Sequence, residues 1–401
     1  MPPPRPQTIK SFFASFCSQK EGLASLPVAA FLAAIFMPAG IAMAFLPLWL
    51  AERGLSAAAI GQVLGVATLA RLLATPGWGR LADHLGRRPV LGAAAGLTTL
   101  ACLALLPAQG FALLMLVVLL QGAAASALAP VTDALTLGLA QQRRLDYGRV
   151  RATGSAAFMA ATALGGWLVD LAGVRIVPLL LAGCYAAATL LAIPLPDHAA
   201  PRPAERPRFG QGGLELLRYR PFLLTLASSA LIQGAHAAYY GLASLYWRQH
   251  GLSDTLIGLL WAEGLISEIA LFFWGRRLAE RLGPAGLTAL AALASILRWG
   301  VTGATTALPA LLVVQLLHGA TFGMQHYSAM LMLNRTVAPS RAATAQTLHA
   351  TLGSSVPTGL LIWFTASLFD GGGQVFLLMA LLAGFALLLV PALRRAWANA
   401  A

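Results

Sequence analysis

The stretch GRLADHLGRR occupies residues 79–88, and an altered copy, GRRLAERLG, occupies residues 275–283. The similarity extends beyond these segments, because GLSAAAIG begins at Gly54 and GLSDTLIG begins at Gly251. The members of each pair lie 196 or 197 residues apart. A constant offset over separate segments indicates a duplicated unit, which here makes up about half of the chain.

The composition places this duplicated chain in a membrane. Of its 401 residues, 58% are hydrophobic and only 10% are charged, and the mean hydropathy is +0.74. A soluble globular protein carries about 25% charged residues. The net charge of +13 does not indicate a nucleic-acid partner, because the basic residues form short clusters between apolar runs. Lipid is therefore the expected solvent for most of the surface.

The apolar runs have the length of membrane spans. About 20 residues at 1.5 Å per residue cross a hydrocarbon layer of roughly 30 Å. We predict an all-α membrane protein with twelve transmembrane helices in two pseudo-symmetric bundles of six. The predicted domains are an N-terminal bundle (1–195), a cytoplasmic linker (196–219) and a C-terminal bundle (220–401). The predicted spans are 27–51, 58–78, 90–107, 111–139, 152–171, 176–195, 221–247, 255–274, 286–306, 308–333, 345–369 and 374–393.

Basic residues predict the orientation, because cytoplasmic loops hold the excess of Lys and Arg. With both termini inside, 22 of the 27 basic residues lie on the cytoplasmic side and only Arg53, Arg175 and Arg248 lie outside. We therefore expect a multi-pass protein of a bacterial-type inner (cytoplasmic) membrane with both termini in the cytoplasm.

The 79–88 stretch resembles the signature loop of the major facilitator superfamily, G-x-L-A-D-x-x-G-R-[RK]. Two glycines permit a tight turn there, and Asp83 can accept hydrogen bonds at a helix N-terminus or pair with an arginine. The resemblance implies that this loop locks the outward-facing state. Asp133, near the cytoplasmic end of its span, is expected to join this gate through Arg149 or Arg151. The predicted gating residues are Gly79, Asp83, Gly86, Arg87, Arg88, Asp133, Arg149 and Arg151.

Other segments resemble the phenylpropionate permease branch of that superfamily, near the nucleoside and oligosaccharide proton symporters. These segments are PVTDAL (130–135), LDYGRVRATGS (145–155), QGAHAAYYG (233–241), LRWGVTGATTALP (297–309) and LLHGATF (316–322). The placement of Glu268, Arg298 and His318 also resembles lactose permease. That protein has a further glutamate about one turn after the histidine, where this chain has Thr321 and Phe322.

Charged side chains within a span cost about 2.5–3.5 kcal/mol each on insertion scales, so each needs a reason. We predict that Glu268, Arg298 and His318 couple transport to protons. An apolar pocket favours the neutral form of a carboxyl group, so Glu268 can be loaded and unloaded with a proton as access changes. Arg298 is the expected partner of Glu268 or of a substrate carboxylate. The alternative is a permanent Glu268–Arg298 ion pair that only joins helices.

A substrate-binding set is predicted from the remaining polar and aromatic residues of the spans. Arg71, the only charge deep in the first half, is the expected anchor of an anionic substrate; the alternative is a pair with Asp133 or with a carbonyl oxygen. Membrane histidines also act as interhelical hydrogen-bond donors, and aromatic residues also form interfacial belts. The predicted set is Arg71, Gln233, His236, Tyr239, Tyr240, Trp261, Phe322 and His326.

These features predict a secondary active transporter that works by alternating access, with proton symport of a small organic anion such as an aromatic carboxylate. Proton symport of a neutral nucleoside or sugar is the alternative, and proton-driven drug efflux ranks below it because the fifth span lacks a glycine-proline signature. No metal cluster, nucleophile elbow or phosphate loop indicates an enzyme. We expect no cofactor except the coupling proton, a small-molecule substrate and the lipid bilayer as partners, and a monomer.

Overall fold

The computed structural model describes residues 19–142, 145–196, 213–338 and 341–399, and within these ranges every regular element is a helix. The predicted all-α fold is confirmed. Nine helical segments of the described ranges are by themselves long and apolar enough to cross a membrane. The other three predicted spans are helical as well, and two of them are interrupted.

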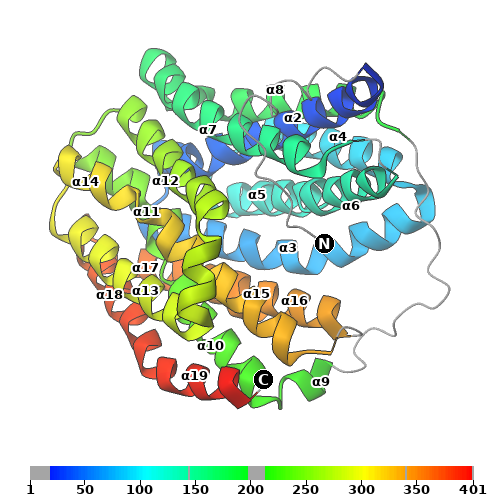
Figure 1. Ribbon diagram of the computed structural model, residues 1–401. Helices are drawn as coiled ribbons and strands as arrows, with labels where there is room; N and C mark the ends of the chain where they lie inside the picture. Colours follow the sequence, from blue (N-terminus) through cyan, green and yellow to red (C-terminus); the bar gives the residue numbers. More distant parts are fainter. Residues whose placement is uncertain (1–18, 143–144, 197–212, 339–340, 400–401) are drawn as a thin grey trace.

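The helices of the first repeat follow its six predicted spans and lie together in the upper part of Figure 1. They are α2 (Gln19–Glu52), α3 (Ala57–Leu85), α4 (Arg87–Leu105), α5 (Phe111–Ala125) with α6 (Leu128–Gln141), α7 (Tyr147–Ala172), the short η2 (Val174–Ile176) and α8 (Val177–Leu191). The fourth span consists of two helices, α5 and α6, and the others are single helices.

The second repeat has the same order with more interruptions. Its elements are α9 (Gly213–Leu216), α10 (Arg220–Gly234), α11 (Ala237–Gln249), α12 (Asp254–Trp274), α13 (Arg276–Ala304), α14 (Leu308–Gln315), η3 (Gly319–Met324), α15 (Gln325–Thr336), α16 (Ala342–Ala350), η5 (Thr351–Ser355), α17 (Val356–Ser367), α18 (Gln374–Gly384), η6 (Phe385–Leu389) and α19 (Val390–Asn399). Residues 197–212, most of the predicted linker, lie outside the described ranges, so the domain boundaries stay a prediction.

The duplication is visible in the backbone. Glycines with positive φ end or interrupt helices at equivalent places of the two repeats, because only glycine adopts this conformation at little cost. The angle is 83° at Gly54 and 88° at Gly251, and it is 93° at Gly86 and 60° at Gly283. The two members of each pair are 197 residues apart. The repeat therefore extends from the residue pattern to the positions at which helices stop.

The structure corrects one expectation for the 79–88 stretch. Its first seven residues are not a loop but the last two turns of α3. Gly86 is the single residue between α3 and α4, which begins at Arg87. A methyl group on Gly79 would meet nothing within 4 Å, so Gly79 serves neither a turn nor a close helix contact. Gly86 is the glycine on which this turn depends.

The two repeats touch closely at the end predicted to lie outside. Gly61 and Gly65 of α3 pack against α17, and Gly166 of α7 packs against the first turn of α12. Gly258, in the second turn of α12, packs against α7 in return. A methyl group on any of these glycines would overlap the facing helix. Small residues allow this approach of helix backbones. The cavity between the repeats is therefore closed at this end.

Candidate substrate and proton-coupling site

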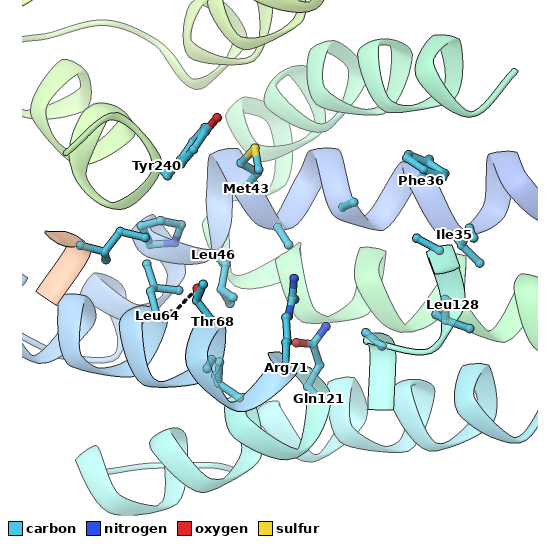
Figure 2. A pocket seen from close by; sticks show the side chains of 18 of the residues that line it. Ile35, Phe36, Met43, Leu46, Leu64, Thr68, Arg71, Gln121, Leu128 and Tyr240 are labelled. Carbon is cyan, nitrogen blue, oxygen red and sulfur yellow. Dashed lines mark hydrogen bonds between the residues drawn. The ribbon is translucent and has the colours of Figure 1, made fainter. Parts of the chain in front are cut away.

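A central cavity with two lobes lies between the repeats. The larger lobe, about 380 Å³, is formed mainly by α2, α3, α5 and α6 (Figure 2). The smaller lobe, about 160 Å³, is formed by α2, α7, α11, α12 and η3. Met43 and Tyr240 line both lobes. A solute of moderate size can therefore contact both repeats at once.

Arg71 brings a positive charge into the larger lobe. Its side chain is exposed to the cavity, and Figure 2 shows it beside Gln121 among otherwise mostly apolar residues. Within the described ranges no carboxylate pairs with Arg71. The alternative partner, Asp133, pairs instead with Nε of Arg151 at 3.6 Å. The guanidinium of Arg71 is thus available to an anion that enters the cavity.

Arg298 is fully buried behind the smaller lobe, where neutral groups satisfy it. Its Nε and Nη2 donate to Oε1 of Gln315 at 3.3 and 2.8 Å, and its Nη1 donates to Thr321 Oγ1 at 3.0 Å. The guanidinium also lies over the rings of Tyr239 and Trp299, at 4.7 and 4.4 Å from their centroids. Such a set of donors and π-faces is what a buried guanidinium needs.

His318 links Arg298 to Glu268. Nη1 of Arg298 lies 2.9 Å from Nδ1 of His318. Because a guanidinium only donates, Nδ1 accepts, and the ring proton of neutral His318 is on Nε2. This Nε2 lies 3.6 Å from Oε2 of Glu268, which lines the smaller lobe. Among the described residues Glu268 and Arg298 form no direct ion pair, and Arg298 is buried behind the cavity wall. His318 is the side chain that lies between Arg298 and Glu268.

His236 closes a break in its own helix. α10 ends at Gly234, and the backbone N–H of His236 donates to Gln233 rather than to Ile232. Nδ1 of His236 donates to the carbonyl oxygen of Ile232 at 3.0 Å instead. Its Nε2 therefore accepts from the hydroxyl of Thr321 at 3.1 Å. His236 is buried and satisfied, so the structure places it behind the cavity wall together with Arg298.

A wide helical turn sets the position of His318. η3, a π-helix that begins directly after His318, packs Gly319 against the backbone of Ser267, whose Oγ accepts from the N–H of Gly319 at 2.9 Å. π-turns within α-helices frequently occur at functional sites. Gly264 of α12 faces the His318 side chain in the same way. Close contact of α12 with η3 thus holds Glu268 and His318 together.

The predicted aromatic residues converge on the smaller lobe. Tyr239, Tyr240, Trp261 and Phe322 line it with Glu268 and His318. The rings of Tyr239 and Trp261 stack with centroids 4.2 Å apart, and Trp261 donates to Ser244 at 3.1 Å. Besides His236, two more of the predicted substrate-binding residues, Gln233 and His326, lie outside this lining. Gln233 is buried and donates to the carbonyl oxygen of Phe322. His326 lies near His349 and lines neither lobe.

Some of the predicted gating residues have polar partners within the described residues, and Asp83 has none. Asp133 pairs with Arg151 as expected, whereas Arg149 pairs with Asp146, the N-cap of its own helix, at 3.5 Å. Arg87 donates to the carbonyl oxygen of Ala134 at 2.9 Å. Asp83 is exposed, and within the described part of the chain no hydrogen bond or ion pair of its carboxylate is found. The carboxylate expected to act in the lock therefore has no partner among the described residues.

Three residues of the site escaped the sequence analysis: Gln121, Gln315 and Thr321. The duplication itself could have shown the first. Adding the 197-residue offset to Gln121 leads to His318, and adding it to Arg71 leads to Glu268. The Arg71–Gln121 and Glu268–His318 pairs thus occupy equivalent positions of the two repeats. Gln315 precedes His318 by three residues and shares its helix face, but its contact with Arg298 depends on tertiary packing.

Comparison with known proteins agrees with this architecture. The sequence profile of the MFS_1 like family matches residues 26–380. The chain belongs to this family. A "Probable 3-phenylpropionic acid transporter" of Escherichia coli (strain K12) is 34% identical over 362 residues, which cover 89% of this chain and 94% of that protein. A maltose permease of Geobacillus stearothermophilus is 32% identical over 340 residues, which cover 82% and 83% of the two chains.

Solved structures show the same fold at low sequence identity. The nucleoside transporter NupG superposes with a TM-score of 0.81 at 17% identity and covers 93% of this chain and 99% of its own. An inward-facing bacterial homolog of the human lysosomal transporter Spinster has a TM-score of 0.73 at 13% identity, with 96% and 98% covered. The predicted family resemblance is confirmed. This member of the MFS_1 like family is a multi-pass secondary transporter of small molecules and not an enzyme.

Gly319→Ala is expected to damage the coupling site of this transporter. The added methyl would lie 2.5 Å from the carbonyl oxygen of Ser267, so η3 must move away from α12 and carry His318 away from Glu268. We expect a loss of about 1–3 kcal/mol in stability, seen as a lower Tm, and reduced transport. Gly300→Ala is the matched control, because its methyl meets nothing within 4 Å. Unchanged Tm and transport in Gly319→Ala would contradict the close contact.

Proposed function

We propose that the chain is a proton-coupled symporter that takes up a small organic anion, with an aromatic carboxylate as the substrate class. The observation that carries this proposal is the guanidinium of Arg71, which faces the cavity without a carboxylate partner among the described residues. A carboxylate matches the planar fork of an arginine through two parallel hydrogen bonds. The apolar walls around Arg71 suit the rest of an aromatic acid.

The larger lobe suggests how such a solute lies. With its carboxylate on Arg71 and Gln121, an aryl group can extend towards Met43 and Tyr240, which open onto the smaller lobe. There it meets the aromatic rings of Tyr240 and Phe322, and ring stacking is favourable for an aryl group. The name of the Escherichia coli relative, a 3-phenylpropionic acid transporter, agrees with a carboxylate joined to an aromatic ring.

Charge balance supports proton coupling. An empty cavity holds Arg71 with one positive charge and ionised Glu268 with one negative charge. A loaded cavity holds an Arg71–carboxylate pair and a protonated Glu268. Both states are neutral over these groups, whereas solute alone or proton alone leaves a net charge in a cavity lined mostly by apolar residues. Uncompensated charge is costly in such surroundings, so the two neutral states are the ones that reorient.

His318 supports the role of Glu268 as the proton carrier. Because Arg298 occupies Nδ1, the proton of neutral His318 is on Nε2, which lies 3.6 Å from Oε2 of Glu268. This donor stabilises the carboxylate when the proton has left, and the carboxylic acid keeps the same neighbour when the proton returns. Arg298 and His318 thereby position the group that carries the proton.

Arg71→Gln is expected to raise KM for 3-phenylpropionate about ten- to hundredfold, because hydrogen bonds to charged groups contribute about 1.5–3 kcal/mol. Arg71→Lys retains the charge but not the fork and should fall between. The measurement is initial uptake of the labelled acid into proteoliposomes. Arg175→Gln is the control, since this side chain is 83% exposed and pairs with Glu52 away from the cavity. An unchanged KM in Arg71→Gln would remove the anion anchor.

Glu268→Gln is expected to abolish uphill accumulation of the acid in a pH gradient while equilibrium exchange of labelled for unlabelled solute continues. The amide cannot carry a proton, yet it keeps the size of the side chain. Glu263→Gln is the matched control, because Glu263 is on the same helix but lines neither lobe. Full accumulation by Glu268→Gln would exclude this residue as the proton carrier.

Electrical measurements separate the anion from the neutral solutes that the maltose permease and NupG names suggest. A monoanion that moves with one proton is electroneutral, so uptake gives no current and a pH unit supplies only about 1.4 kcal/mol. A neutral solute with one proton carries charge and gains about 2.3 kcal/mol per 100 mV. We expect no current with 3-phenylpropionate. A current with maltose or uridine, and no uptake of the acid, would favour the alternative.

A further inference from the structure

The carboxylate of Asp170, near the end of α7, caps the first turn of α12 in the other repeat. Its Oδ1 accepts from the backbone N–H of Asp254 at 2.9 Å. Its Oδ2 accepts from the backbone N–H of Thr255 at 2.8 Å and from the hydroxyl of Thr255 at 2.5 Å. These hydrogen bonds connect two repeats that otherwise meet here through glycine contacts.

Helix physics explains why a carboxylate suits this position. The first N–H groups of an α-helix have no partner within the helix, and the helix dipole places partial positive charge there. Within its own repeat α12 has Ser253 as N-cap, which accepts from Leu256 N–H at 3.3 Å. Asp170 satisfies the neighbouring N–H groups of Asp254 and Thr255. Charge-assisted hydrogen bonds of this kind are stronger than those between neutral groups.

Two neighbouring features make this contact specific. The side chain of Asp254 pairs with Arg248 at 3.2 Å, so its negative charge is compensated within its own repeat beside Asp170. Gly166, one helical turn before Asp170, lets α7 approach the backbone of Asp254. The three hydrogen bonds therefore form only while α7 and α12 are in close contact.

We propose that Asp170 is the outer latch of the transport cycle, a positioning residue whose carboxylate must release the N-terminus of α12 each time the cavity opens to the outside. At the opposite end the Asp83 carboxylate, expected to lock the other state, is exposed in this conformation. Asp170 forms its hydrogen bonds while the outer end is closed, and Asp83 forms its own in the outward-facing state. The inference needs no particular solute or coupling ion, so it stands apart from the proposed proton symport.

Distance measurements test the latch without any solute. Spin labels at Gln109→Cys and Ala307→Cys, both exposed in outer turns of different repeats, are placed in a chain whose Cys17, Cys102 and Cys184 are Ala. Double electron–electron resonance then reports the separation of the outer ends. Asp170→Ala is expected to raise the ratio of outward-open to outward-closed molecules by about tenfold or more, the effect of losing one hydrogen bond to a charged group.

Further variants separate a latch from a general structural role. Asp170→Asn keeps the size and loses the charge, and Thr255→Val removes only the hydroxyl donor, so both should shift the ratio less than Asp170→Ala. Glu52→Gln is the matched control, because it breaks the Glu52–Arg175 pair at the same end but within one repeat. If Asp170→Ala, Asp170→Asn and Thr255→Val all give the distance distribution of the parent chain, the latch is overturned. A lower Tm with unchanged distances overturns it equally.

Discussion

The buried guanidinium of Arg298 is the constraint on which the rest of the site depends. A cation with no exposed surface, in a bundle surrounded by lipid, must find all its hydrogen bonds within the protein. Gln315, His318 and Thr321 supply them, and each also contacts a further group of the site. Gln315 donates to Tyr239, His318 faces Glu268, and Thr321 meets His236. One satisfied charge thereby orders the whole wall of the smaller lobe.

The same site also shows the internal duplication of the chain. Arg71 and Glu268 are equivalent residues of the two repeats, as are Gln121 and His318. One position has become a cation that faces the cavity, and the other has become an acid held by a histidine. The charges of Arg71 and ionised Glu268 at these symmetric positions are opposite and cancel. The asymmetry between the repeats is therefore chemical, whereas the helices that carry it have kept their order.

The sequence predicted the large features well, for physical reasons. Long apolar runs must be helices in lipid, and the repeat offset locates equivalent turns such as Gly54 and Gly251. Ionisable residues in spans were a good guide to the cavity, since Glu268, His318 and Arg71 line it. Spacing could not show which charge pairs with which. Arg298 was expected to partner Glu268 or a substrate carboxylate, yet His318, directly before η3, lies between Arg298 and Glu268.

The sequence by itself determined the class of the molecule: a duplicated bundle of membrane helices with charges concentrated where lipid would exclude them. These properties depend on composition and on periodic patterns along the chain, so no contact between distant residues is needed to recognise them. Only the tertiary structure decided the partners, because hydrogen bonds of 3 Å depend on how helices far apart in sequence approach each other. The capping of α12 by Asp170, the burial of His236 and the free guanidinium of Arg71 all result from that packing.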